Sequence, residues 1–206
     1  MLNFLHITKG SFFMIVIHDF GIGLEEYGSR GKGNEFPMFD RCPDCHCIAQ
    51  GNVHRNGYYW RYAIDEADQA VHIPICRFRC LACGVNISIL PDFLIPYYQH
   101  TLHTIVERVH LLLRGKKAIG SRQQLAQHTK RFYEILHWTH SFLMDLGHPL
   151  GFTQDQKKEA LKYMKMIQDI GVSTFFRRSW GHLSTYFMGK LILPYLSREK
   201  NKVSPT

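Results

Sequence analysis

The spacing of apolar residues changes once along the chain, near residue 96. Before this point, short apolar runs and alternating patterns predict β-strands. The expected strands are residues 12–17, 58–64, 71–79 and 86–90. Polar residues 66–69 predict the turn of a hairpin, and Asn56-Gly57 is a further turn signal. The glycine-rich residues 28–33 predict a flexible link.

Beyond residue 96 the apolar residues follow helical spacing. One apolar face lies within residues 102–113, and Gly115 is expected to end that helix. Ser121 is expected to cap a short helix that carries Leu125 and Ala126. Further helices are expected to begin at Thr129 and Thr153 and to end at Gly147 and Gly171. The chain is therefore expected to be α+β, with a small β unit followed by an all-α domain.

Three segments are expected. Residues 1–40 form an N-terminal extension with one short strand, residues 41–92 a β unit, and residues 96–206 a basic helical domain. The longest apolar run, residues 12–17, is too short to span a bilayer, so we expect a cytoplasmic protein without a membrane partner. Met14 is an alternative native start, which the sequence alone does not decide.

Two Cys-x-x-Cys pairs stand out within the β unit. Cys42 and Cys45 form the first pair, and Cys80 and Cys83 the second, with 34 residues between the pairs. Each pair can form a tight knuckle that presents two thiolates, and four thiolates suit a tetrahedral zinc ion. Because four thiolates close the coordination sphere, the ion is expected to be a single structural Zn²⁺. Two knuckles joined by a hairpin predict a zinc ribbon, in which the metal supplies stability that so small a core lacks.

The other readings of these cysteines are disulfides, free core thiols and a redox pair. Nothing indicates secretion, and no βαβ pattern surrounds either pair, so zinc is favoured. Cys47 could replace Cys45 as a ligand, although the longer spacing makes a poorer knuckle. Cys76 is expected to be a small buried apolar residue.

Charge is unevenly distributed. Residues 1–96 carry eight Lys and Arg against ten Asp and Glu, whereas residues 97–206 carry seventeen against seven. The second half therefore holds the positive excess, which favours an anionic partner, most simply DNA. RNA stays open as an alternative, and a solvated basic surface is the simpler explanation.

The expected helices within residues 121–146 resemble a helix-turn-helix, whose second helix reads the major groove of DNA. The side chains expected at base edges are Lys130, Arg131, Tyr133, Glu134 and His137. Those expected at phosphates are Lys116, Lys117 and Arg122. An ordinary helical hairpin with a charged outer face is the alternative.

The motifs also resemble a known family. The order of Cys42-Pro-Asp-Cys45, Cys80-Leu-Ala-Cys83-Gly84 and the apolar segment at residues 90–97 is similar to a bacterial family of unknown function. Its members pair a transposase-type zinc ribbon with helix-turn-helix-like helices. The resemblance implies insertion-sequence ancestry and DNA binding.

Three functions compete at this point. The first is a zinc-ribbon DNA-binding protein of the mobile-element type, and a remnant or accessory subunit of a transposase is close to it. The second is a protein-interaction adaptor, with a transposase or another protein as partner. The third, a transposase with its own strand-transfer chemistry, is disfavoured because the seven acids beyond residue 97 show no catalytic pattern. The chain is therefore expected not to be an enzyme.

Overall fold

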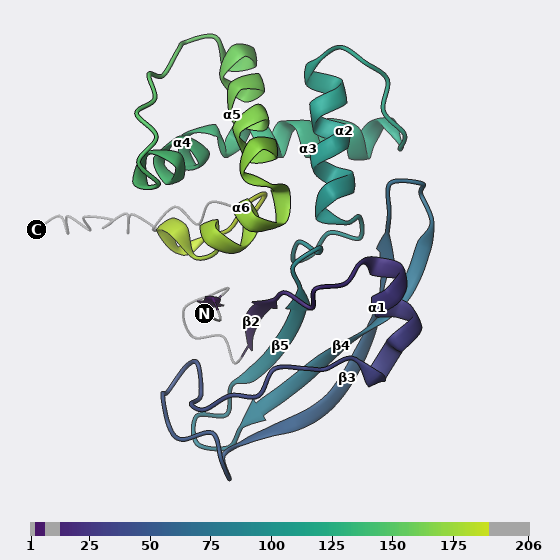
Figure 1. The fold of residues 1–206 in the computed structure, drawn as a ribbon, viewed down its shortest axis with the longest axis vertical. Coiled ribbons are helices and arrows are strands. Elements are labelled where there is room, and N and C mark those ends of the chain that lie inside the picture. The colour runs from purple at the N-terminus through teal and green to yellow at the C-terminus, as the bar shows by residue number, and fades with distance from the viewer. Residues whose placement is uncertain (1–2, 7–12, 190–206) are drawn as a thin grey trace, which may run out of the picture.

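The computed structural model describes residues 3–6 and 13–189, and it shows an α+β fold. In Figure 1 a twisted sheet lies below a group of helices. The described sheet has five strands in the order β1-β2-β5-β4-β3. These are β1 (Asn3–His6), β2 (Phe13–His18), β3 (Val53–Ile64), β4 (Ala70–Cys80) and β5 (Asn86–Pro91). The expected α+β class is confirmed.

Strand β2 confirms the strand expected from the first apolar run. It lies parallel to β5, with Ile15 opposite Ser88, while β5 runs antiparallel to β4. The pattern predicts the strand but not its partner, because the partner is more than sixty residues away in the chain. The N-terminal strand is thus an integral part of the sheet that carries the cysteines.

The glycine-rich segment is a helix and not a flexible link. Helix α1 (Leu24–Arg30) is followed by a short 3-10 helix (Gly31–Gly33). Tyr27 is fully buried, and its hydroxyl donates a hydrogen bond to the carbonyl of Pro74 in β4. The prediction was wrong because this tertiary contact outweighs the low helix propensity of glycine.

Strands β3 and β4 form a long antiparallel hairpin. Its turn lies between Asp65 and Gln69, where polar residues predicted it. Asn56-Gly57 is not a turn, because both residues lie inside β3. The strand register shifts there, and Gly57 has a φ of 84°. The signal was therefore that of a β-bulge, which also uses a glycine with positive φ.

Five helices follow the sheet within the described residues. They are α2 (Leu102–Leu113), α3 (Arg122–Glu134), α4 (Leu136–Asp145), α5 (Gln156–Ile170) and α6 (Val172–Ser179), and a 3-10 turn (His182–Ser184) comes after them. Ser121 caps α3 as expected, since its hydroxyl accepts a hydrogen bond from the backbone N–H of Gln124. Asp155, not Thr153, caps α5 by accepting from the backbone N–H groups of Lys157 and Lys158.

The expected break at Thr129 does not exist. Helix α3 continues through this residue, and the Thr129 hydroxyl donates to the carbonyl of Leu125 one turn earlier. The chain changes direction only at Ile135, between α3 and α4. The short helix and turn drawn from the sequence are therefore wrong in this region.

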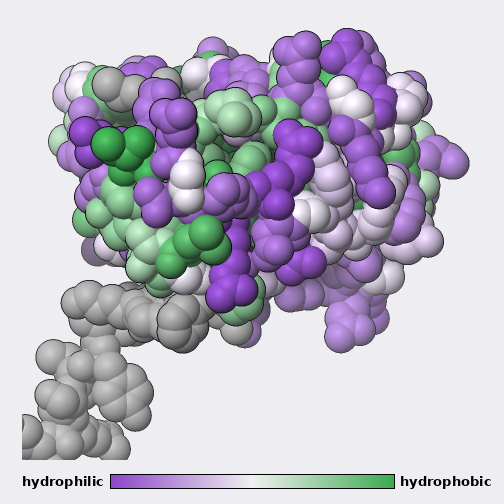
Figure 2. Space-filling model, turned by 90° about the horizontal axis from the view of Figure 1, so that it is seen from below, coloured by the Kyte–Doolittle hydropathy of each residue, from purple (hydrophilic) through white to green (hydrophobic). Residues whose placement is uncertain are grey.

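The sheet and the helices share one continuous apolar core. At their junction, Arg177 of α6 forms ion pairs with Asp19 and Asp92, which directly follow the parallel strands β2 and β5. Figure 2 looks at the sheet end of the molecule, where hydrophilic side chains cover most of the surface and hydrophobic ones gather toward one side. No helix in the described ranges is long and apolar enough to cross a membrane.

Candidate metal centre and basic helical surface

The two cysteine pairs have the same backbone geometry. In the first knuckle the N–H of His46 donates to the carbonyl of Cys42 at 3.0 Å, and in the second the N–H of Gly84 donates to Cys80 at 2.9 Å. The N–H groups of Cys42 and Cys80 in turn donate to the carbonyls five residues ahead, at Cys47 and Val85. The two loops are therefore structural equivalents.

Each knuckle needs a residue with positive φ after its second cysteine. Gly84 has a φ of 76° and His46 a φ of 60°. Glycine takes this conformation without a Cβ penalty, whereas histidine is strained in it. His46 therefore adopts a turn conformation that a glycine would adopt more easily.

The sulfur atoms of the two knuckles converge. The ligand atoms of Cys42, Cys45, Cys80 and Cys83 all lie within 4.8 Å of one another. The Sγ atoms of Cys42 and Cys83 are 3.8 Å apart, as are those of Cys45 and Cys80. With Zn–S bonds of about 2.3 Å, a regular tetrahedron has S–S edges of about 3.8 Å. The four cysteines expected from the spacing thus form a cluster with the size of a zinc–thiolate site.

The surroundings also favour the thiolate form of Cys80, one of the four cysteines of this cluster. Burial acts to raise the pKa of Cys80, but the backbone N–H groups of Cys83 and Ala82 and the neighbouring thiols lower it to about 6. Cys80 is therefore ready to bind a metal at neutral pH, because the thiolate is the ligand. The chemistry and the geometry of the four cysteines both fit Zn²⁺.

The remaining two cysteines differ from each other. Cys76 is fully buried in β4, as expected of a small apolar residue. The Sγ atom of Cys47 lies 3.7 Å from that of Cys80, yet Cys47 is not part of the mutually close group of four. Burial raises the pKa of Cys47 to about 12, whereas a hydrogen bond from the backbone N–H of Cys47 lowers the pKa of Cys45. The set with Cys45 is therefore favoured.

We expect purified protein to contain about one zinc ion per chain, as for a single closed site. Cys80→Ser should abolish this content, because it removes a central ligand, while Cys76→Ser should keep it. Elemental analysis of the two variants measures this directly. Equal metal loss in both variants would contradict the assignment.

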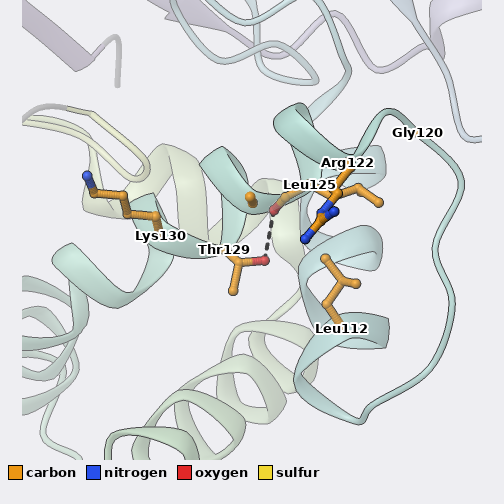
Figure 3. A pocket seen from close by; sticks show the side chains of 7 residues that line it. Leu112, Gly120, Arg122, Leu125, Thr129 and Lys130 are labelled. Atoms are coloured by element: carbon orange, nitrogen blue, oxygen red, sulfur yellow. Dashed lines mark hydrogen bonds between the residues drawn. The ribbon is translucent and has the colours of Figure 1, made fainter.

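The expected phosphate contacts gather around the junction of α2 and α3. Lys116 and Lys117 lie exposed in the connecting loop, and Arg122 opens α3. A groove of about 510 Å³ lies between the two helices, with Arg122 and Lys130 among its lining residues (Figure 3). The other lining residues are Leu112, Gly120, Leu125, Ala126 and Thr129. None of the lining residues is acidic.

The other expected base contacts are placed less favourably. Arg131 is half-buried and forms an ion pair of 2.8 Å with Glu134 in the same helix. Tyr133 packs against the core, and the ring of His137 stacks on Phe152 with centroids 4.7 Å apart. Because α3 begins at Arg122, Arg131 lies in its last turns and not in the first turn of a separate recognition helix.

The family comparison agrees with the position of the cysteine cluster. Residues 41–129 match the family model of a domain of unknown function, DUF6431. The DUF6431 match takes in both knuckles, Lys116, Lys117 and Arg122, and it ends inside α3. No curated protein and no solved structure matches the chain.

Sequence reasoning missed a buried polar cluster between the hairpin turn and the helices. Arg108 of α2 is almost fully buried and binds Asp68 of the turn at 2.9 Å, and His100 lies 3.7 Å from the same carboxylate. The ring of His128 in α3 lies next to His100, with centroids 5.8 Å apart. Arg108 and His128 lie on the buried faces of their helices. The sequence pattern did not predict this, because only apolar residues were expected in the core.

Proposed function

We propose that the chain is a zinc-stabilised DNA-binding protein of the mobile-element type, without a catalytic domain of its own. The observation that carries the proposal is the charge of residues 108–133, which hold seven Lys and Arg and no Asp or Glu. Four of these cations are exposed: Arg122 and Lys130 line the groove between α2 and α3, and Lys116 and Lys117 lie in the loop before α3. Such a surface is suited to the phosphate backbone of a nucleic acid.

In this proposal the metal centre has a structural role. The zinc ion would hold the two knuckles and thereby the β3–β4 hairpin. Asp68 in the hairpin turn forms an ion pair with Arg108 of α2. The folded sheet would therefore hold α2 in place, and the basic loop follows directly after α2. The basic surface would give affinity for duplex DNA rather than sequence preference, because phosphate contacts carry no base information. RNA duplexes are the alternative ligand.

Lys116→Ala combined with Lys117→Ala should weaken binding to all duplex sequences alike. Two phosphate contacts are lost, so the slope of log affinity against log salt should fall by up to about 2. Fluorescence anisotropy of a labelled duplex at several salt concentrations measures both quantities. Lys157→Ala with Lys165→Ala is a matched control, since it removes the same charge from exposed positions on α5. Equal losses in the two double variants would refute a localised surface.

A protein-interaction adaptor is the second candidate, and one observation favours it. Two large apolar side chains beside the knuckles are exposed, Ile48 at 60% and Leu81 at 64%. Large exposed apolar patches mark protein contacts, so these two side chains are where a partner would bind. If neither lysine double variant affects DNA binding, the adaptor, with a transposase or another protein as partner, becomes the better proposal.

A further inference from the structure

Three aromatic side chains near the turn of the β3–β4 hairpin form an exposed row. They are Trp60 and Tyr62 of β3 and His72 of β4. Tyr62 lies directly opposite His72, and Trp60 is two residues from Tyr62 along β3, so the three side chains share one face of the hairpin. The centroid of the His72 ring lies 5.0 Å from that of Trp60 and 4.8 Å from that of Tyr62, with tilts of 32° and 31°. The rings are therefore held in one partly stacked arrangement.

This face of the hairpin is open, whereas the opposite face is covered. Trp60 is 45% exposed and Tyr62 is 54% exposed, and His72 is exposed as well. The opposite face is completely buried at the alternate positions Ala63, Ile73 and Ile75. Strand β3 is at the edge of the described sheet, so no further strand there flanks the outer side of the row. Clustered exposed rings of this kind mark a binding surface rather than a core.

Positive charge lies at the inner end of the row. Tyr58 is on the same face as Trp60, two residues earlier, which is about 7 Å along the strand. The ammonium of Lys32 lies 5.6 Å, and the guanidinium of Arg55 5.9 Å, from the centroid of the Tyr58 ring. Both cations are exposed. Cations beside exposed rings suit a ligand that carries both negative charge and flat faces.

The five strands as a whole carry only positive charge. They contain four arginines and no Asp or Glu. The arginines are Arg55, Arg61, Arg77 and Arg79. The acids of the hairpin turn are engaged elsewhere, because Asp68 pairs with Arg108, and Asp65 and Glu66 line a separate cavity of about 410 Å³. None of the three rings lines that cavity.

We infer that this face binds the unpaired bases of a single-stranded nucleic acid. Bases would stack on the rings of Trp60 and Tyr62, while Lys32 and Arg55 contact phosphates. The stack with His72 holds the two rings in place, so less side-chain entropy is lost on binding. Bases in a duplex are already stacked on one another, so their faces are not accessible to these rings. The inference goes beyond the proposed function, because it uses the hairpin and not the surface between α2 and α3.

Tryptophan fluorescence measures the stacking directly, since Trp60 differs from the other two tryptophans of the chain. Trp138 is 2% and Trp180 6% exposed, whereas Trp60 is 45% exposed. An oligothymidylate of about 12 nucleotides should therefore quench the emission of Trp60 when its bases stack there. Trp60→Phe should remove the quenching but keep most of the binding, because phenylalanine also offers a ring to a base.

Loss of the rings and loss of a cation should have different effects on affinity. With a labelled oligothymidylate, Trp60→Leu should weaken binding at least about fivefold. Lys32→Gln should lower the slope of log affinity against log salt by about 0.7, the value for one phosphate contact on a single strand. Binding to a blunt duplex of equal length should change little in either variant.

Matched controls are provided by other elements of the chain. Phe152→Leu changes an aromatic residue that is also 45% exposed but lies outside the sheet, and Lys157→Gln changes an exposed lysine of α5. Neither control should alter single-strand binding. Zinc content and the thermal midpoint show whether each variant is folded, and Tyr62→Leu is the second ring variant in case Trp60→Leu perturbs the hairpin.

The outcomes separate this inference from the proposed function. If folded Trp60→Leu and Tyr62→Leu proteins bind the oligothymidylate as the unchanged chain does, or if the unchanged chain does not bind it, the inference is overturned and the rings serve only to stabilise the hairpin. If these variants lose single-strand binding while Lys116→Ala with Lys117→Ala leaves duplex binding intact, the inference stands and the proposed duplex surface fails.

Discussion

Removing zinc from the four-cysteine centre is expected to unfold the β3–β4 hairpin and both knuckles. Structural zinc in small domains contributes about 10–16 kcal/mol of apparent binding free energy. This matches or exceeds the total stability of about 5–15 kcal/mol of an ordinary domain. Without the ion, no bond would hold the two knuckle loops together. Hydrogen exchange before and after chelation should show loss of protection around residues 41–52 and 76–86.

The internal control for this experiment is the hydrogen-exchange protection of the helices that lie away from the knuckles. Helices α4 and α5 lie far from the knuckles in sequence and should keep more of their protection than the hairpin does. Adding zinc back to the chelated protein should restore the exchange pattern. A chelated chain that keeps its full thermal midpoint would show that the cysteine cluster does not stabilise the fold.

The metal centre could be predicted from the sequence because its signal is local. A Cys-x-x-Cys spacing and the residue after it determine a knuckle almost independently of the rest of the chain. The second knuckle has glycine at the position of positive φ, which strengthens the signal. Only the pairing of the two knuckles is non-local, and their equal spacing suggested it. The spacing already favoured Cys45 over Cys47, and the sulfur positions agree with that preference.

The helix-turn-helix boundaries could not be predicted, because Thr129 is ambiguous. A threonine hydroxyl can cap a helix, or it can bond back to the carbonyl four residues earlier within one. The inward positions of α3 include His128, which is 4% exposed. Counted as polar, His128 interrupts the apolar pattern between Leu125 and Phe132, and an apparent gap results. The apolar pattern of a helix that buries a histidine therefore predicts two shorter helices.

The charge of the sheet was hidden for a different reason. Adding charge over half the chain combines strand arginines with acids in turns, and the two cancel. Alternation around Arg77 and Arg79 was visible in the sequence, but the pairing of this strand with β5 was not. The parallel pairing of β2 with β5 was hidden in the same way.

The stability of the protein is expected to fall as the pH drops from 6.5 towards 4, in part through His128. This ring is buried, and its Nδ1 has no hydrogen-bond partner within the described residues. Burial, and then the charges of His100 and Arg108, lower the pKa of His128 from 6.5 to about 4. In the same cluster Asp68 binds Arg108, and the centroid of the Tyr98 ring lies 5.7 Å from that of His128.

The direction follows from proton binding. Below pH 6.5 the unfolded chain protonates His128, while the folded chain does not do so until about pH 4. The unfolded state therefore binds more protons in this window, and stability decreases with falling pH by up to about 1.4 kcal/mol per unit. The full contribution, of order 3 kcal/mol, is present above pH 6.5 and lost at pH 4.

His128→Gln removes this titration and should flatten the dependence. Between pH 6.5 and 5, urea unfolding of the variant should show a loss smaller by about 2 kcal/mol than that of the unchanged chain. His137→Gln, at an exposed position of α4, is the matched control and should keep the original slope. Each variant should be compared with its own stability at pH 7, because glutamine also leaves a polar group buried at position 128. If both variants show the same slope as the unchanged chain, His128 is not the group that couples acid to unfolding.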